Sequence, residues 1–203
     1  CSSDLFRFLP ITLALYYLAP AKWKNTVLFL CSLVFYSWGE VRLFPVMAAA
    51  ILINYTAGLG MEKFAHSKRA RLFFLLYSIV GSLGMLMFFK YTNFFITNLN
   101  ALLGTSISTL SLTLPLGISF YTFQTMSYSI DVYRGDVPAE HNLIDFGAYV
   151  VMFPQLIAGP IVKYRDVSDR LHVLKGRVTM DRVEEGVYLF ILGLAKKVLL
   201  ADG

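Results

Sequence analysis

The chain has 203 residues, of which 57% are hydrophobic and only 15% are charged. Soluble domains carry about 45–50% apolar and about 25% charged residues, so this composition argues against an ordinary soluble protein and indicates lipid-facing helices. The formal net charge of +5 does not indicate a nucleic-acid partner, because the basic residues are spread over short loops without interleaved stacking aromatics.

Apolar stretches of about 18 residues are long enough to cross roughly 30 Å of hydrocarbon as helices. The first two stretches, residues 5–19 and 26–38, are shorter. They are predicted to span with help from side chains such as Trp23 that anchor at the membrane interface. Three further stretches meet the required length and are predicted spans: residues 43–60, 72–89 and 112–130.

The remaining stretches are less regular. Residues 92–104 number about 13 and contain several polar side chains, so an interfacial helix is expected there rather than a span. Residues 143–162 are long enough to cross, but prolines break the segment, and we expect it to enter and leave the membrane on one side. Residues 187–200 are apolar until Lys196 and Lys197 interrupt them.

Charge placement predicts the topology. If residues 143–162 do not cross, thirteen of the 18 Lys and Arg residues fall on one side of the membrane. The positive-inside rule makes that side cytoplasmic and places the N-terminus outside. A rival topology lets both 92–104 and 143–162 cross. The fold class predicted in either case is all-α, a polytopic transmembrane helical bundle with short, broken or re-entrant helices.

Polar side chains within the span at 112–130 mark a first candidate site. Tyr121, Gln124 and Tyr128 follow i, i+3, i+7 spacing and therefore share one helix face. Such a face has to look into protein or a watery cavity, because polar groups are costly in lipid. Two interpretations stay open, a substrate path and interhelical hydrogen bonding.

The second candidate site is the break in residues 153–161. Pro154 and Pro160 lack backbone donors, and Gly159 permits close backbone approach. Irregular backbone at membrane depth is tolerated only inside protein or beside a cavity. Gln155 is the polar side chain that we most expect near a substrate.

Other chemical signals are weak. No nucleotide-binding, hydrolase or metalloprotease motif is present, no metal site is predicted and no catalytic residue is assigned. None of the three histidines lies in the middle of a span, and His141 has no evident partner at a fixed spacing that would make it a general base. Asp131 and Arg134, three residues apart at a helix end, are expected to form a local ion pair.

Two motifs carry a resemblance to a known family. PLGISFYTFQTMSYSIDVYRG at 115–135, followed by YVVMFPQLIAGPIVKYRDV at 149–167, resembles the membrane-bound O-acyltransferase superfamily, most closely its alginate O-acetyltransferases. FYSW at 35–38 and GLAKKVLLAD at 193–202 agree with the same family. The resemblance covers nearly the whole chain.

The resemblance implies acyl transfer across a bacterial inner membrane. Acetyl-CoA in the cytosol would be the donor, no cofactor would be bound, and a periplasmic or extracellular acetyl-acceptor protein would be the partner. The family's catalytic histidine lies in a tryptophan–histidine segment that residues 1–203 do not contain. The resemblance therefore implies that 1–203 is the N-terminal part of one membrane domain and is inactive alone.

Two alternatives remain at this point. One is D-alanyl transfer for teichoic acid by a more distant branch of the same superfamily. The other is a non-enzymatic polytopic transporter, since broken helices and polar groups near the midplane also mark transporters. No inverted repeat is visible to favour a transporter.

Overall fold

The computed structural model describes residues 2–110, 113–115, 117–158, 162–172 and 180–196. Within these ranges the regular structure is entirely helical, which confirms the all-α prediction. The chain forms two units, Cys1–His172 and Val173–Gly203. The first unit contains α1 to α8, and the second contains α9 (Met180–Lys196), which overlaps the apolar stretch predicted at 187–200.

The first three helices follow the predicted stretches. α1 (Ser2–Leu18) and α2 (Lys24–Glu40) are joined by the short 3-10 helix η1 (Ala21–Trp23), and η2 (Val41–Leu43) leads into α3 (Phe44–Lys63). Aromatic rings tie these helices to a later one, since Phe8 of α1 and Phe35 of α2 both pack on Phe153, with ring centroids 5.4 and 5.2 Å from it. Aromatic packing thus fixes the N-terminal pair of apolar helices to Phe153.

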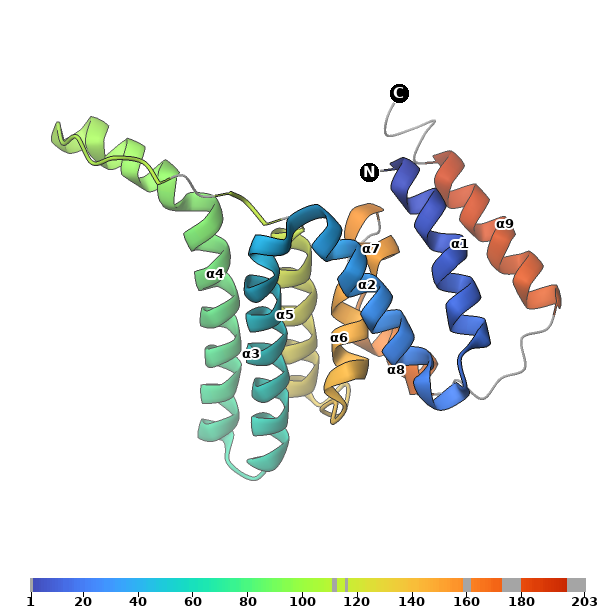
Figure 1. Cartoon of the computed structure of the whole chain (residues 1–203). Coiled ribbons are helices and arrows are strands. Elements are labelled where there is room, and N and C mark those ends of the chain that lie inside the picture. The colour runs from blue at the N-terminus through green and yellow to red at the C-terminus, as the bar shows by residue number, and fades with distance from the viewer. Residues whose placement is uncertain (1, 111–112, 116, 159–161, 173–179, 197–203) are drawn as a thin grey trace. The chain divides into compact units, whose positions relative to one another are not determined.

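α4 (Lys68–Leu103) differs from the prediction, because it is one continuous helix of 36 residues rather than a span followed by a separate interfacial helix. No proline or glycine lies between Lys90 and Leu103, so nothing in the backbone stops the helix before Gly104, whose φ of 64° ends it. Near its C-terminal end the helix bends and leaves the bundle sideways (Figure 1).

α5 (Ile118–Arg134) begins later than predicted. The sequence predicts a span from residue 112, but the helix starts only at Ile118. Pro115 and Gly117, which has a φ of 71°, lie just before this start. The helix then runs past residue 130 to Arg134, where Gly135 in the left-handed conformation accommodates the end.

A fully buried amide joins α3, α4 and α5. Asn54, in the middle of α3, donates through Nδ2 to Ser82 Oγ at 2.9 Å and accepts through Oδ1 from Ser78 Oγ at 2.6 Å. The same Oδ1 accepts from Ser129 Oγ of α5 at 2.9 Å, and Nδ2 also donates to the Ala50 carbonyl. These bonds cross-link three apolar helices through one side chain, which is the way polar groups are used between helices in lipid.

The outward faces of α3 and α4 are strongly apolar. Both helices are long and apolar enough to cross a membrane by length and composition. On α4, large side chains such as Phe73 and Val80 are about two-thirds exposed, whereas Ser78 and Ser82 are fully buried. This inside-out distribution is the reverse of a soluble helix and supports a membrane bundle.

The broken segment forms a hairpin. α6 (Leu143–Val151) ends at Met152, which is extended at φ −52° and ψ 106°, and α7 (Phe153–Ala158) follows at once. The break therefore comes two residues before Pro154, because a helix continuing through Pro154 would clash with the carbonyl four residues earlier. Gly159 and Pro160 lie outside the described residues.

Both flanks of this hairpin lie at one end of the first unit. We call it the basic end, the end at which α3 finishes at Lys63, α4 begins at Lys68 and α5 finishes at Arg134 (Figure 1). α8 (Tyr164–His172), a helix that the sequence did not predict, also lies there. Tyr164 hydrogen-bonds to Glu140, just before α6, so the chain has returned to the level at which it started.

This geometry yields a topological prediction. Single cysteines at His141 and Arg165, whose side chains are 71% and 52% exposed, should both label with an impermeant thiol reagent only after cells are opened. The background is the full-length protein with Cys1 and Cys31 replaced by serine. The adjacent residues Asn142 and Tyr164 are left unchanged, because Asn142 caps α6 and Tyr164 is buried. Labelling of either cysteine in intact cells would contradict a re-entrant hairpin with a cytoplasmic base.

Candidate functional site

The three polar side chains predicted on one face of α5 do share a buried face. Tyr121, Gln124 and Tyr128 are 0%, 3% and 0% exposed. Gln124 Nε2 donates to the Tyr149 carbonyl of α6 at 2.9 Å, and the Tyr128 hydroxyl accepts from the Glu140 backbone N–H at 2.9 Å. Two of the three are thus hydrogen-bonded to backbone, Gln124 to helix α6 and Tyr128 to the loop before it, and the Gln124 bond fits the interhelical role that the sequence left open.

Tyr128 is held by close packing as well as by its hydroxyl. Gly58 of α3 faces it, and a Cβ at Gly58 would lie only 2.5 Å from the Tyr128 hydroxyl oxygen. The ring packs against Phe146 and Tyr164, with centroids 4.6 and 5.0 Å away. Tyr128 therefore joins four elements, α3, α5, α6 and α8, at one point.

A buried carboxylate lies next to this aromatic cluster. Glu140 is 5% exposed, and its Oε1 accepts from the Asn142 backbone N–H at 2.8 Å while Oε2 accepts from the Tyr164 hydroxyl. Burial, together with the neighbouring carboxylate, raises the pKa of the Tyr164 phenol, so this group stays protonated and remains a donor. Glu140 thus pins the start of α8 to the base of the hairpin.

Asn25, at the start of α2, reinforces the same base. Its amide nitrogen donates to Asp145 Oδ1 at 2.8 Å and to the Leu171 carbonyl at 2.9 Å, and so links α2, α6 and α8. Asp145 also accepts from Asn142 through its second oxygen. Each carboxylate in this cluster is therefore engaged in holding helix ends together.

His141 gains in the structure a partner that the sequence could not indicate. Its Nε2 lies 3.0 Å from Glu62 Oε2 at the end of α3, and its carbonyl accepts from the Tyr55 hydroxyl at 2.6 Å. The pair joins positions far apart in the chain, so spacing alone gave no signal. Because the His141 and Glu62 side chains are 71% and 45% exposed, this contact contributes little stability.

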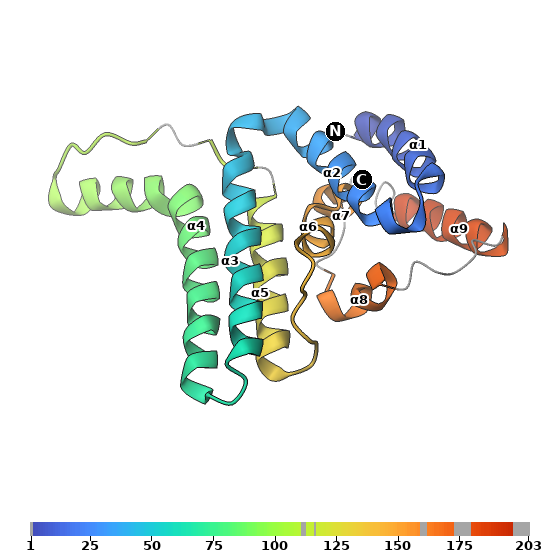
Figure 2. The same ribbon diagram turned by 60° about the horizontal axis from the view of Figure 1, so that its bottom comes forward.

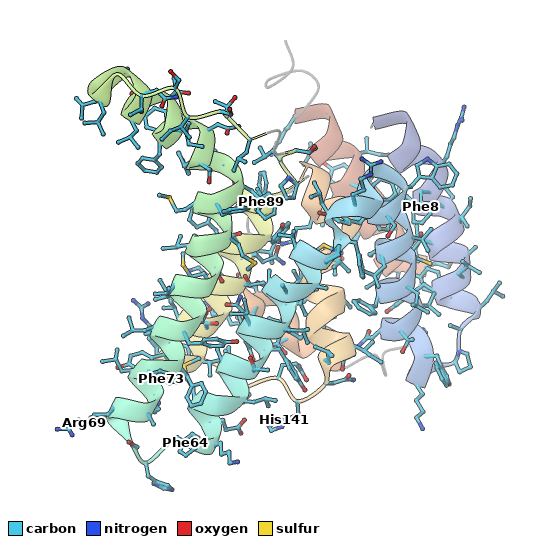
Figure 3. The ribbon with its side chains drawn as sticks, turned by 60° about the vertical axis from the view of Figure 1, so that its left-hand side comes forward. Phe8, Phe64, Arg69, Phe73, Phe89 and His141 are labelled. Atoms are coloured by element: carbon cyan, nitrogen blue, oxygen red, sulfur yellow. The ribbon has the colours of Figure 1, made fainter. Side chains whose placement is uncertain are left out.

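A cavity of about 540 Å³ opens at the basic end, between the loop before α6 and α8. Its lining includes Glu140, His141, Asn142, Asp145, Tyr164 and Ser168. Among the described residues no group of three or more His, Cys, Asp or Glu side chains is arranged to hold a metal ion. The cavity size is in the range of small-molecule sites, and its walls offer hydrogen-bonding groups rather than a charged cradle for phosphates. Figure 3 shows His141 at the same end as Phe64 and Arg69.

At the broken segment, Gln155 is the residue with unused polar capacity. Its Nε2 is buried and has no hydrogen-bond partner among the described residues, although its backbone N–H bonds to the Met152 carbonyl at 3.1 Å. A buried amide whose donors are not used costs free energy, which makes Gln155 the polar group of this segment to test. Pro154 lies beside it in the first turn of α7.

The expected Asp131–Arg134 ion pair is wrong. Asp131 is 7% exposed, Arg134 is exposed, and no ion pair joins them in the described structure. Asp131 Oδ2 is instead buried without a hydrogen-bond partner among the described residues. Asp131 is directed into the bundle whereas Arg134 is exposed, so the two side chains do not meet although the i, i+3 spacing would allow it.

Two polar residues of structural importance were not identified from the sequence, Asn54 and Asn25. Asn54 is the single amide in the stretch 43–60, and a lone amide in an apolar span indicates a buried polar contact. Asn25 borders the predicted span at 26–38, and nothing in its local sequence indicates its contacts. Only tertiary contacts identify its role.

Replacing Gln155 by leucine in the full-length protein tests whether this amide faces a substrate. Leucine has a similar size and leaves no unsatisfied donor, so the variant should be as stable as the parent. Turnover in the acyl transfer that the resemblance implies should fall by about tenfold, a loss of about 1.4 kcal/mol of transition-state stabilisation. Gln124→Leu is the comparison variant, because the Gln124 amide already donates to the Tyr149 carbonyl and its loss should lower stability together with turnover. Full activity in Gln155→Leu would make Gln155 a packing residue.

The chain is closely similar to named proteins over nearly its whole length. It is 43% identical over 202 residues, 98% of its length, to a protein of Pseudomonas aeruginosa named probable alginate O-acetylase AlgI. A protein of the same name from Azotobacter vinelandii is 42% identical over 203 residues, again 98% of the chain. The chain is a relative of the alginate O-acetylases. This finding confirms the resemblance predicted from residues 115–135 and 149–167.

A further similar protein carries a different name. The peptidoglycan O-acetyltransferase of Helicobacter pylori is 31% identical over 228 residues and 98% of the chain. The chain spans 38% of the Pseudomonas aeruginosa relative and 43% of the Helicobacter pylori relative, so it covers about two-fifths of such proteins. No family model and no solved structure matches it.

Proposed function

We propose that the chain is part of a membrane-bound O-acetyltransferase that moves an acetyl group across the inner membrane for O-acetylation of an exported polysaccharide such as alginate. The observation that carries this proposal is the similarity over 98% of the chain to proteins named for O-acetylation of two different polymers. The higher identity to the alginate O-acetylases favours a polysaccharide related to alginate.

The fold is compatible with such a membrane role. α3 and α4 are long and apolar, their outward faces are apolar, and the polar side chains gather between helices. The hairpin of α6 and α7 supplies irregular backbone inside the bundle, where a path for a small acyl group can run without exposing the backbone to lipid. Tyr121, Gln124, Tyr128, Pro154 and Gln155, with Gly159 and Pro160, are the proposed lining of that path.

In this proposal acetyl-CoA approaches from the cytosol at the basic end. Lys63, Lys68 and Arg69 lie around the loop between α3 and α4, and their charge would attract the phosphates of the donor. The acetyl group leaves at the opposite end to an acceptor protein outside the membrane. No described residue is assigned a catalytic role.

Reconstitution tests the proposal. The full-length protein is placed in vesicles with acetyl-CoA, labelled on the acetyl group, on one side and the acceptor protein on the other. We expect label to reach the acceptor, and we expect residues 1–203 alone to transfer none. Transfer from a D-alanyl thioester but not from acetyl-CoA would replace the proposal by D-alanyl transfer. Release of an intact solute without acetylation would indicate a transporter.

A further inference from the structure

The end of α4 and the segment after it form a projection that we call the arm, residues 92–110. The straight part of α4 runs beside α3 and α5, whereas the arm turns away at the end opposite to the basic end (Figures 1 and 2). Phe89 marks the region where α4 leaves the bundle (Figure 3). The non-helical residues 104–110 run back beside the helix, and all of them are exposed.

Two asparagines clamp the returning segment to the helix. Asn93 and Asn100 are seven residues apart and share one helix face. Asn100 donates to the Ile107 carbonyl at 2.8 Å and accepts from the Ile107 N–H at 3.0 Å. Asn93 makes the same pair of bonds with Leu110, at 2.8 and 3.0 Å. The amides therefore satisfy backbone groups that a non-helical segment would otherwise have to present to water.

The opposite edge of the arm is an apolar stripe. Phe95, Leu99 and Leu102 follow i, i+4, i+7 spacing and are 55%, 42% and 82% exposed. Thr97 lies on the polar edge with the two clamping asparagines. Residues 91–130 contain no Asp, Glu, Lys, Arg or His, so the arm carries no charge.

We propose that the arm lies flat in the interfacial layer of the outer leaflet, with its stripe against the acyl chains and its clamped edge toward the headgroups. A stripe of large apolar side chains left in water is unfavourable, and α4 itself holds the arm at the level where a membrane-spanning helix ends. The clamp removes the backbone groups that the interface would satisfy poorly. Because the arm is uncharged, its contact with lipid is independent of anionic headgroups.

This inference rests on the membrane embedding in the proposed function and is independent of acetyl transfer. Its test uses the full-length protein with a single nitroxide at Leu102 or at Thr97, in phosphatidylcholine vesicles without any partner protein. Collision rates with oxygen, which concentrates in lipid, and with a water-soluble nickel chelate are compared. The oxygen-to-nickel ratio should be several-fold higher at Leu102 than at Thr97. Adding phosphatidylglycerol should leave both ratios unchanged.

Three results would overturn the inference. Equal and high nickel access at the two positions would mean that the stripe faces water and is left for a protein partner. Exclusion of nickel from both positions would mean that the arm crosses the membrane. The third result concerns a label at Ile107, which should become more mobile in Asn100→Ala and not in Asn98→Ala, because Asn98 bonds only within its own helix. An unchanged label in Asn100→Ala would refute the clamp.

Discussion

Replacing Asn54 by alanine should lower the free energy of unfolding of the full-length protein by about 2–4 kcal/mol. The substitution leaves the hydroxyls of Ser78, Ser82 and Ser129 buried without their shared partner. Each such bond contributes about 0.6 kcal/mol on average between membrane helices, and the buried unpaired hydroxyls add a further cost. The measurement is the midpoint of unfolding by a denaturing detergent.

Asn98→Ala is the matched control for that substitution. Asn98 lies on α4, is exposed and donates only to the Phe94 carbonyl, so its loss should change stability by less than about 0.5 kcal/mol. If Asn54→Ala behaves like Asn98→Ala, the three serines have found other partners, and the amide does not hold α3, α4 and α5 together.

Glu140→Ala should destabilise the base of the hairpin by about 2–4 kcal/mol. Its removal leaves the Tyr164 hydroxyl and the Asn142 N–H without this acceptor, and α8 loses its hydrogen bond to the loop before α6. Glu140→Gln should be milder, because the amide oxygen still accepts one of these bonds. A cysteine at Arg165 should react faster with a thiol reagent in the alanine variant, which reports the release of α8 directly.

Glu62→Ala distinguishes the effect of losing buried hydrogen bonds from the effect of losing a negative charge. Glu62 is also a glutamate at the basic end, but it pairs with His141 in an exposed position, so the change should cost less than about 1 kcal/mol. Equal effects of Glu140→Ala and Glu62→Ala would contradict the view that the buried hydrogen bonds, rather than the negative charge, stabilise this end.

Local pattern predicted the helices because apolar stretch length and helix periodicity are local properties. The spacing of Tyr121, Gln124 and Tyr128 alone predicted their shared inward face. The prolines at 154 and 160 predicted a broken helix. The exact limits did not follow in the same way. α4 continues past the predicted end of the span at residue 89, and the stretch up to Leu103 contains no glycine or proline that would interrupt the helix.

The contacts that hold the candidate site together could not be predicted, because they join residues far apart in the chain. His141 meets Glu62, Asn25 meets Asp145, and Tyr164 meets Glu140 only after the helices have packed. Helix α8 was missed because its residues are charged and lie in a segment that reads as a basic loop. A sequence pattern shows which face is polar, whereas the partner on that face is decided by tertiary structure.

The short helices of the hairpin also constrain how the protein is made. α6 has nine residues and α7 has six, so at 1.5 Å per residue neither can cross roughly 30 Å of hydrocarbon alone. The carbonyls and N–H groups around Met152 would be exposed to lipid if this segment entered the membrane without neighbours. During synthesis α2 and α5 are complete before residue 143 is added, so both helices are already available for the hairpin to pack against. For the proposed membrane bundle we therefore expect insertion of the hairpin to be a late, packing-dependent step in biogenesis, driven by the helices made earlier rather than by the hydrophobicity of the segment.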